Sequence, residues 1–264
     1  MAEPRFQHST PELYDRYMGP FLFEPCAKVV AERVATLMPS RILETAAGTG
    51  ILTRAMNRVA SAAQIIATDI NAALLDYARI TIASPNIEFR PADALNLPFL
   101  ARDFDLVACQ FGAMFFPDRI RANVEALRVL RGNGHYLLVT FDALERNPIP
   151  KAAEDAVNAL FPDAPIRYMK SGPFCYAETK QIEMDVLAAG FNAVEIETVT
   201  LSSPVNAEDA ATGLVFGSPL SSEITSRDAS ALQRAAEVVA DALQPWDGKN
   251  APMSVHIAIA RKCS

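Results

Sequence analysis

Two glycines and two carboxylates in the first third of the chain have the types and spacing best suited to chemistry. The stretch from Arg41 to Gly50 reads R-I-L-E-T-A-A-G-T-G, and the next apolar run along the chain ends in Asp69. A strand that enters a glycine turn and then a helix brings backbone N–H groups close to a ligand. A carboxylate at the end of the following strand is placed to bind a ribose. The spacing therefore predicts a pocket for a nucleoside-containing cofactor.

The last position of the glycine turn separates two cofactor classes. A dinucleotide-binding turn follows the pattern G-x-G-x-x-G or G-x-G-x-x-A, whose last small residue lets helix and strand pack closely. Here Gly48 and Gly50 fit, but Thr53 occupies the last position, and the acidic Glu44 before the glycines is not part of that pattern. The sequence therefore disfavours an NAD(P)-dependent oxidoreductase, which stays open as an alternative.

The composition limits the classes of partner. The 264 residues are half hydrophobic and carry a formal net charge of −7, with no run of basic residues. Nucleic-acid backbones are bound by clustered Lys and Arg, so we expect no nucleic-acid partner. The four cysteines lie far apart and form neither a metal-binding pattern nor a disulfide framework, which suits a reducing compartment. No apolar stretch of the sequence is long enough to span a bilayer, and we expect a cytoplasmic protein that uses neither a membrane nor a metal ion.

Apolar runs and helical patterns alternate through the first half of the chain, as the strands and helices of a doubly wound α/β sheet do. The expected strands are Arg41–Thr45, Gln64–Thr68, Ile87–Arg90, Phe104–Gln110 and His135–Phe141. The expected helices between them are Gly50–Arg58, Ala72–Arg79 and Arg119–Leu130. Two more helices precede the first strand, one from an N-cap at Thr10 to Tyr17 and one from Leu22 to Leu37. This order predicts a Rossmann-like sheet whose ligand lies at the carboxyl ends of the strands.

The second half of the chain combines the rest of the sheet with a helical cap. We expect helices at Lys151–Leu160, Glu178–Ala189, Ala207–Phe216 and Ser222–Leu243, and strands at Val194–Thr200 and Ser254–Ala260. The predicted organisation is one structural domain in four parts: N-terminal lid helices in residues 1–38, a cofactor-binding core in 39–143, a cap insertion in 144–177, and the C-terminal half of the sheet in 178–264 with a helical insertion at 202–249.

Five segments follow one another in the order of a known family: Leu43–Gly50 as a glycine motif, Asp69 after the second strand, Ala92-Asp93-Ala94 after the third, Phe104–Val107 as the fourth, and Leu127–Gly134 before the fifth. In these segments the chain resembles the class I S-adenosylmethionine-dependent methyltransferases, particularly their small-molecule type 11 group. An ordered series is far more specific than a lone pair of glycines. The resemblance implies a doubly wound sheet with an antiparallel last strand, S-adenosylmethionine as the cofactor, and methyl transfer as the reaction.

The resemblance also implies how the glycine turn and its neighbouring acids bind the cofactor. The backbone around Ala46, Gly48 and Gly50 would face the methionine and ribose parts, and Asp69 would accept hydrogen bonds from both ribose hydroxyls. A competing role for Asp69 is to cap the helix that follows. Glu44 would face the same turn, with the alternative that it only bonds nearby loop N–H groups and orients the turn.

The later motifs supply the rest of the expected cofactor pocket. Ile70 would lie on the adenine face, Asp93 would accept from the adenine amino group, and the Ala94 N–H would lie beside it. Gln110 and Phe111 would border the transferred methyl group. An ordinary turn residue is the alternative for Asp93, and a core residue is the alternative for Phe111.

The family likeness extends to the helix before the sheet, where we expect Tyr17 to contact the methionine end of the cofactor; surface packing is the alternative. Methyl transfer from a sulfonium needs little acid–base catalysis, but a hydroxyl or protonated amine acceptor needs a base. Asp142, at the end of the fifth strand, and His8 are the candidates for that base. His135 lies at the wrong edge of the sheet, and His256 lies within the last strand, where we expect a structural role.

The segment after the fourth strand indicates the class of methyl acceptor. It reads Gln110-Phe111-Gly112-Ala113, whereas methyltransferases that act on amino groups of nucleic acids and proteins carry Asn/Asp-Pro-Pro-Tyr there. With the acidic net charge and the aromatic residues of the cap, this departure favours a small, partly apolar organic acceptor. We therefore expect a small-molecule methyltransferase. The alternatives are the oxidoreductase above and a protein that binds S-adenosylmethionine without catalysis.

Overall fold

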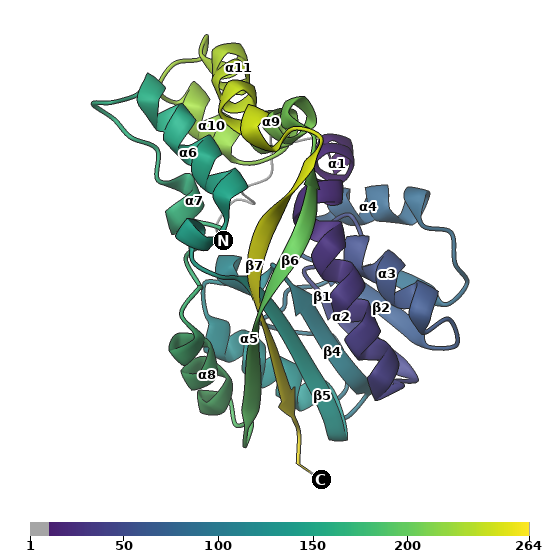
Figure 1. Ribbon diagram of the computed structural model, residues 1–264. Helices are drawn as coiled ribbons and strands as arrows, with labels where there is room; N and C mark the ends of the chain where they lie inside the picture. The colour runs from purple at the N-terminus through teal and green to yellow at the C-terminus, as the bar shows by residue number, and fades with distance from the viewer. Residues whose placement is uncertain (1–10, 264) are drawn as a thin grey trace. The chain divides into compact units, whose positions relative to one another are not determined.

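A seven-stranded sheet in the order β3-β2-β1-β4-β5-β7-β6 forms the frame of the structure, a computed structural model (Figure 1). Its first five strands, β1 to β5, all pair in parallel. The β7 strand pairs with β5 in the antiparallel direction, with Phe141 opposite Val255. The fold is therefore the doubly wound α/β sheet with an antiparallel last strand that the sequence predicts. The strands are β1 (Arg41–Thr45), β2 (Gln64–Asp69), β3 (Ile87–Pro91), β4 (Phe104–Gln110), β5 (Leu130–Phe141), β6 (Val194–Val205) and β7 (Lys249–Arg261).

The structure describes residues 11–263, and its contacts divide them into two compact units. The sheet unit comprises Cys26–Asp142, Tyr176–Val199 and residues 255–263, and the helical unit comprises residues 11–25, Ala143–Cys175 and Thr200–Ser254. The helical unit thus contains the helical insertion and nearly all of the cap insertion, whereas the segment expected as a lid is divided, with residues 11–25 in the helical unit and 26–38 in the sheet unit. That they form one structural domain with the sheet stays a prediction. Within residues 11–263, no helix has the length and apolar character needed to cross a membrane.

Helices on both sides of the sheet complete the sheet unit. Figure 1 shows α2, α3 and α4 on one side and α5 and α8 on the other. Side-chain caps fix the starts of two of them: Asn71 accepts from the Ala73 N–H before α4, and Asp118 accepts from the Arg121 N–H before α5. The helices are α2 (Glu24–Leu37), α3 (Ile51–Val59), α4 (Ala72–Thr81), the 3₁₀ turn η2 (Ala113–Phe115), α5 (Arg119–Val129) and α8 (Thr179–Ala188).

Two helical segments of the helical unit differ from the sequence prediction, and β6 and β7 extend into this unit beyond their predicted bounds of Val194–Thr200 and Ser254–Ala260. The segment expected as one helix over Ser222–Leu243 is interrupted, because Asp228 accepts hydrogen bonds from both the N–H and the hydroxyl of Ser230 and so forms a turn instead of helix. A π-helix around Pro20 follows the first short helix, since proline offers no N–H to the α-helical ladder. The Thr10 cap lies outside the described residues. The helices are α1 (Pro11–Leu13), η1 (Tyr14–Phe23), η3 (Leu144–Arg146), α6 (Pro148–Leu160), α7 (Tyr168–Ser171), α9 (Ala207–Phe216), α10 (Leu220–Thr225), α11 (Leu232–Leu243) and η4 (Gln244–Trp246).

Replacing Leu137 tests the core of the sheet unit. Leu137 is fully buried in β5, between Ala108 of β4 and Ile259 of β7. The Leu137→Ala variant should lower the free energy of unfolding, measured with urea, by about 2–5 kcal/mol, because it leaves a cavity between packed strands. Leu100, which is 81% exposed, is the matched control, and Leu100→Ala should change that free energy by less than about 0.5 kcal/mol. Equal effects of the two variants would contradict this assignment of the core.

Candidate functional site

The carboxyl ends of neighbouring parallel strands bring the sequence-predicted residues of the sheet unit together. The β1 strand lies between β2 and β4, and the glycine turn leaves it at Ala46. Ala46 and Phe111, which directly follow β1 and β4, both adopt left-handed backbone conformations, with φ of 53° and 56°. Residues other than glycine adopt this conformation at an energetic cost, and such residues cluster at functional sites. Two adjacent strand ends therefore carry strained backbone where the fold places a ligand.

The carboxylate of Asp69 ties the end of β2 to the glycine turn. Its Oδ2 accepts from the Gly48 N–H at 2.9 Å, and its Oδ1 accepts from the Asn71 N–H at 2.8 Å. Burial raises the pKa of Asp69, and these backbone hydrogen bonds oppose that rise. Asn71 caps α4, so the alternative that Asp69 is the helix cap is wrong. The carboxylate instead holds two loops in one arrangement.

A buried hydrogen bond between Glu44 of β1 and Thr53 of α3 joins the two elements that flank the glycine turn. The Thr53 hydroxyl donates to Glu44 Oε2 at 2.5 Å, and both side chains are buried. Burial raises the pKa of Glu44 to about 8, and the nearby Asp69 carboxylate also acts in that direction. Thr53, the residue that departs from the dinucleotide pattern, thus has a partner at the turn. The Glu44 carboxyl group thus accepts from a hydroxyl of α3, and its bonding to loop N–H groups stays a prediction.

Small residues let the turn and the loop after β4 approach each other. A Cβ atom added to Gly112 would lie 2.3 Å from the Ala46 Cβ, and one added to Gly50 would lie 2.4 Å from Ile82 Cδ1. Gly50 also has a φ of 81°, which favours glycine. By contrast, an added Cβ at Gly48 would meet no atom within 4 Å. Gly48 thus faces open space, and its backbone N–H holds the Asp69 carboxylate.

The residues expected around an adenine ring lie at the adjoining ends of β2 and β3. Ile70 is 71% exposed, so the edge carries an accessible apolar side chain. The Ala92 N–H donates to the Asp69 carbonyl at 3.0 Å and so joins the loop after β3 to the end of β2. Asp93 is exposed, and its Oδ1 accepts from the Leu95 N–H at 2.8 Å. Asp93 is therefore a turn residue, as one alternative held, and still presents its carboxylate at this edge. Ala94 follows it, partly buried.

At the end of β4, the Phe111 side chain belongs to the core. It is 7% exposed, and its ring stacks on that of Phe141 with the centroids 3.9 Å apart. The Phe111 N–H donates to the Val139 carbonyl at 3.0 Å. Gln110, one residue earlier, is partly buried. Contact of Gln110 and Phe111 with the transferred methyl group stays a prediction.

Asp142, the candidate base, contacts a histidine that the sequence did not connect with it. His256 Nε2 lies 3.3 Å from Asp142 Oδ1 and 2.8 Å from the Ala177 carbonyl oxygen, and its Nδ1 lies 2.9 Å from the Thr198 hydroxyl. The antiparallel register of β5 and β7, which pairs Thr140 with His256, produces this contact. No single-residue signal in the sequence sets that register. Three partners hold the imidazole and place it to orient the carboxylate.

Of the remaining predicted residues, one belongs to the helical unit and one lies outside the described residues. His8 lies outside the described residues. Tyr17 lies in η1 of the helical unit, partly buried, with the Arg16 guanidinium 5.2 Å from its ring centroid. Its contact with a cofactor stays a prediction. In residues 11–263, no cluster of three or more His, Cys, Asp or Glu is placed to hold a metal ion.

The pKa of Glu44 generates a prediction about stability. Because the folded protein keeps Glu44 protonated up to about pH 8, against 4.5 ordinarily, the free energy of unfolding should fall as the pH rises between these values, by at most about 1.4 kcal/mol per pH unit. Below pH 4.5 this contribution is fully present. Glu44→Gln, which keeps an acceptor for Thr53, should remove the slope in urea unfolding at several pH values. Glu195→Gln, at an exposed position, should keep it. Parallel wild-type and Glu44→Gln curves would contradict the buried, protonated state.

Comparisons with known sequences agree with the geometry of this edge. The family described as "Methyltransferase domain" matches residues 43–138. The ubiquinone/menaquinone biosynthesis C-methyltransferase UbiE of Pseudomonas paraeruginosa (strain DSM 24068 / PA7) is 30% identical over 175 residues, which cover 61% of this chain and 68% of the relative. The corresponding protein of Pseudomonas aeruginosa (strain LESB58) is 29% identical over the same length and coverage. The matched family region contains the glycine turn, Asp69, Asp93 and the end of β4.

Similarity of fold extends to most of the chain. Phosphoethanolamine N-methyltransferase 2 of Haemonchus contortus, solved with S-adenosyl-L-methionine, matches with a TM-score of 0.61 and 15% identity over 96% of this chain and 57% of that protein. The [4+2]-cyclase SpnF matches with a TM-score of 0.57 and 21% identity over 91% of this chain and 81% of that one. These likenesses show a shared fold. Together with the family match and the related sequences, they establish that the chain belongs to the class I S-adenosylmethionine-dependent methyltransferases.

Proposed function

We propose that this methyltransferase transfers the methyl group of S-adenosylmethionine to a small, partly apolar organic molecule. The observation that carries the proposal is the Asp69 carboxylate, which bonds the N–H groups of Gly48 and Asn71 at the end of β2. A carboxylate oxygen accepts more than one hydrogen bond, so both oxygens keep acceptor capacity for the two ribose hydroxyls. Asp69 would thus bind the ribose and keep the glycine turn in place.

The neighbouring residues fit the other parts of the cofactor. The backbone of Ala46, Gly48 and Gly50 is proposed to face its methionine and ribose parts. On the other side of Asp69, the exposed Ile70 offers an apolar face to the adenine ring. Asp93 uses Oδ1 for the Leu95 N–H, and its other oxygen is suited to accept from the adenine amino group.

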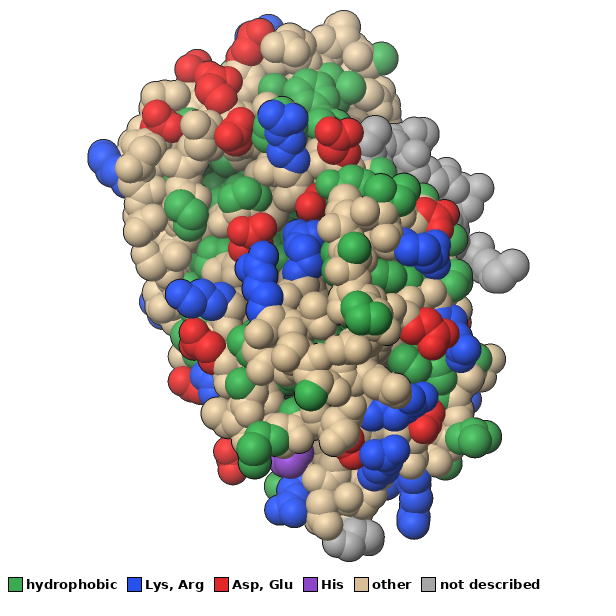
Figure 2. All heavy atoms as spheres, turned by 90° about the vertical axis from the view of Figure 1, so that its right-hand side faces the viewer, with side chains coloured by type: hydrophobic (Ala, Val, Ile, Leu, Met, Phe, Trp, Pro, Cys, Tyr) green, Lys and Arg blue, Asp and Glu red, His purple; other side chains and the backbone are tan. Residues whose placement is uncertain are grey.

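The proposed acceptor class rests on the segment after β4, the charge of the chain and its relatives. The segment Gln110–Ala113 lacks the Asn/Asp-Pro-Pro-Tyr pattern, and the net charge is −7. On the face shown in Figure 2, Lys and Arg side chains are interspersed with Asp and Glu and do not gather into the basic stripe that a nucleic-acid backbone needs. The related UbiE proteins are named for ubiquinone/menaquinone biosynthesis. These observations favour a small organic acceptor.

Methyl transfer from a sulfonium requires mainly that the protein align the two reactants. When bound, S-adenosylmethionine would supply an activated methyl group, whose carbon–sulfur bond breaks as the acceptor atom attacks the methyl carbon in line, with S-adenosylhomocysteine as the leaving group. Holding reactants in line and away from water can provide roughly 7–11 kcal/mol of the rate enhancement in favourable cases. For an acceptor that must lose a proton, we propose that Asp142 takes it, with His256 orienting the carboxylate from 3.3 Å.

Loss of the Asp69 carboxylate should weaken cofactor binding. In calorimetry with S-adenosylhomocysteine, Asp69→Ala should lose about 2 kcal/mol or more of binding free energy, because it removes a charged hydrogen-bond acceptor. Asp76→Ala is the matched control, since it removes a carboxylate from α4 that pairs with the exposed Arg79. Unchanged affinity in Asp69→Ala would contradict the ribose assignment. Binding of NAD without binding of either form of the S-adenosyl cofactor would overturn the proposed reaction.

Replacing Asp142 by asparagine tests its proposed role as the base. With an acceptor that carries a protonated nucleophile, identified from a panel of small phenols, amines and acids, Asp142→Asn should lower kcat by about 100-fold or more. The Kd for S-adenosylhomocysteine should not change. Asp163→Asn, at an exposed position, should behave as wild type. A wild-type kcat in Asp142→Asn would remove the base from the account and leave the cofactor site untouched.

A further inference from the structure

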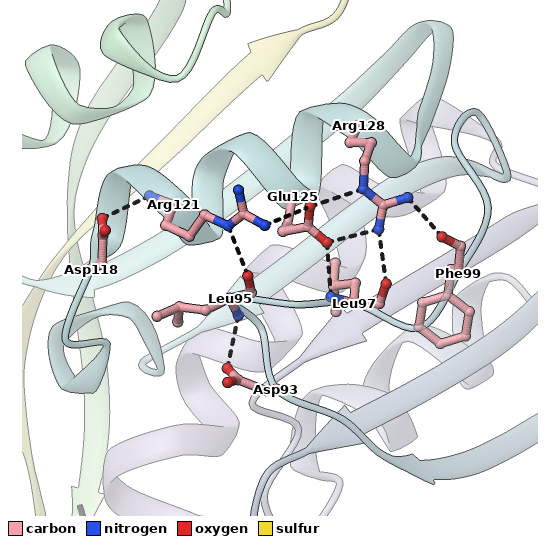
Figure 3. Close-up of polar contacts among 8 residues, drawn as sticks. All are labelled: Asp93, Leu95, Leu97, Phe99, Asp118, Arg121, Glu125 and Arg128. Carbon is pink, nitrogen blue, oxygen red and sulfur yellow. Dashed lines mark hydrogen bonds and ion pairs between the residues drawn. The ribbon is translucent and has the colours of Figure 1, made fainter. Parts of the chain in front are cut away.

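The loop that carries Asp93 is held in place by a helix that does not itself belong to the cofactor site. Residues 92–103 connect β3 to β4 and form turns and one isolated bridge between Asp93 and Asn96. A segment with so little regular structure needs other partners for its backbone polar groups. Three side chains of α5, those of Arg121, Glu125 and Arg128, supply them (Figure 3).

These contacts follow the loop residue by residue. Arg121 Nε donates to the Leu95 carbonyl at 3.0 Å. Arg128 donates to the Leu97 carbonyl at 2.8 Å and to the Phe99 carbonyl at 2.7 Å. In the opposite direction, the Leu97 N–H donates to Glu125 Oε2 at 2.8 Å. The four bonds fix alternate residues of the loop against one face of α5.

Glu125 and Arg128 also bind each other through two parallel hydrogen bonds. Arg128 Nε lies 2.9 Å from Glu125 Oε1, and Nη2 lies 2.7 Å from Oε2. The Arg128 guanidinium holds the pKa of Glu125 below its usual range, although the Glu125 side chain is only 5% exposed. Arg128 is 34% exposed, and an ion pair with one buried partner adds little net stability; its better-attested use is to specify one arrangement. The two parallel hydrogen bonds fix the orientation of the Arg128 guanidinium relative to the Glu125 carboxylate.

The network reaches Asp93 through one residue. Leu95 accepts from Arg121 at its carbonyl and donates from its N–H to the Asp93 carboxylate at 2.8 Å. The start of the loop is fixed as well, by the Ala92 N–H on the Asp69 carbonyl. Asp93 is exposed, so without these anchors its carboxylate would have to be ordered when a ligand binds. Ordering a group in advance lowers that cost.

We propose that Arg121, Glu125 and Arg128 are positioning residues for adenine recognition: they hold the loop so that Asp93 meets the adenine amino group. The inference rests on the proposed function, in which Asp93 accepts from that amino group. The three side chains contact the loop and act through Asp93. Their loss should therefore weaken binding of the adenine part of the cofactor, and should lower selectivity for adenine over a purine that carries an oxygen in place of the amino group.

A double-mutant cycle with Asp93→Ala tests the proposal in the full-length protein. Arg128→Lys keeps the positive charge but loses the planar two-point geometry, and should raise the Kd for S-adenosylhomocysteine about tenfold. It should also reduce the preference for S-adenosylhomocysteine over S-inosylhomocysteine. In the Asp93→Ala background, the same substitution should change the Kd by less than about twofold, since the group that it positions is gone.

Two further variants separate positioning from stability. Arg121→Gln removes the bond to Leu95 from a side chain that is 52% exposed, so it should fold and should shift the Kd and the selectivity in the same direction as Arg128→Lys. Arg131→Lys is the control, because Arg131 pairs with Asp105 at 2.8 Å and is not one of the loop contacts. It should bind as wild type.

The outcomes of the cycle distinguish a failure of the positioning role from a failure of the adenine assignment. If Asp93→Ala weakens binding while Arg128→Lys and Arg121→Gln do not, the positioning role is wrong and the cofactor site stands. Equal effects of Arg128→Lys with and without Asp93 would likewise overturn positioning. If Asp93→Ala itself leaves the Kd and the selectivity unchanged, the adenine assignment in the proposed function fails, and the positioning inference fails with it.

Discussion

The hydrogen bond from the Gly48 N–H to the Asp69 carboxylate, 2.9 Å long, is the contact on which the candidate site depends. It joins the turn after β1 to the end of β2, and the second Asp69 oxygen joins the same point to the start of α4. Asp69 is 8% exposed, and a carboxylate this far removed from water is retained only where hydrogen bonds stabilise it. The bond therefore shapes the turn and holds the carboxylate at the strand end where we propose that a ribose binds.

Other features of the sheet unit serve the same edge. Thr53 donates to the buried Glu44 at the end of β1, and Gly112 lets the loop after β4 approach Ala46. On the far side, α5 holds the loop of Asp93 (Figure 3). The fold alone does not assign the reaction, since the [4+2]-cyclase SpnF has a similar one. The family assignment comes from related sequences, and the chemistry proposed for this chain comes from residues at the ends of its strands.

Local pattern was enough to predict most of the sheet from the sequence. Strands such as β1 and β4 have the predicted bounds because a buried parallel strand is a short apolar run between turn residues. The break between α10 and α11 was missed because a single turn, Asp228–Ser230, overrides a helical pattern that continues on both sides of it. β5 begins at Leu130, five residues before the expected start at His135, because it pairs there with Phe104 across an irregular register.

The site was predictable where both partners of a contact are motif residues on neighbouring parallel strands, and not where a contact depends on packing or register that no motif contains. Gly48 and Asp69 are both motif residues, so their proximity follows from the parallel sheet. The contact of Asp142 with His256 depends on the register of an antiparallel strand more than 100 residues away in the chain. Arg128 and Leu97 meet 31 residues apart, through packing that no single motif records.

The most direct test of the central claim is a crystal structure of the protein with S-adenosylhomocysteine. The account predicts both ribose hydroxyls within hydrogen-bond distance of the Asp69 carboxylate, the adenine ring against Ile70, and its amino group beside Asp93. A cofactor bound away from the ends of β1 and β2, or a ribose without contact to Asp69, would contradict it.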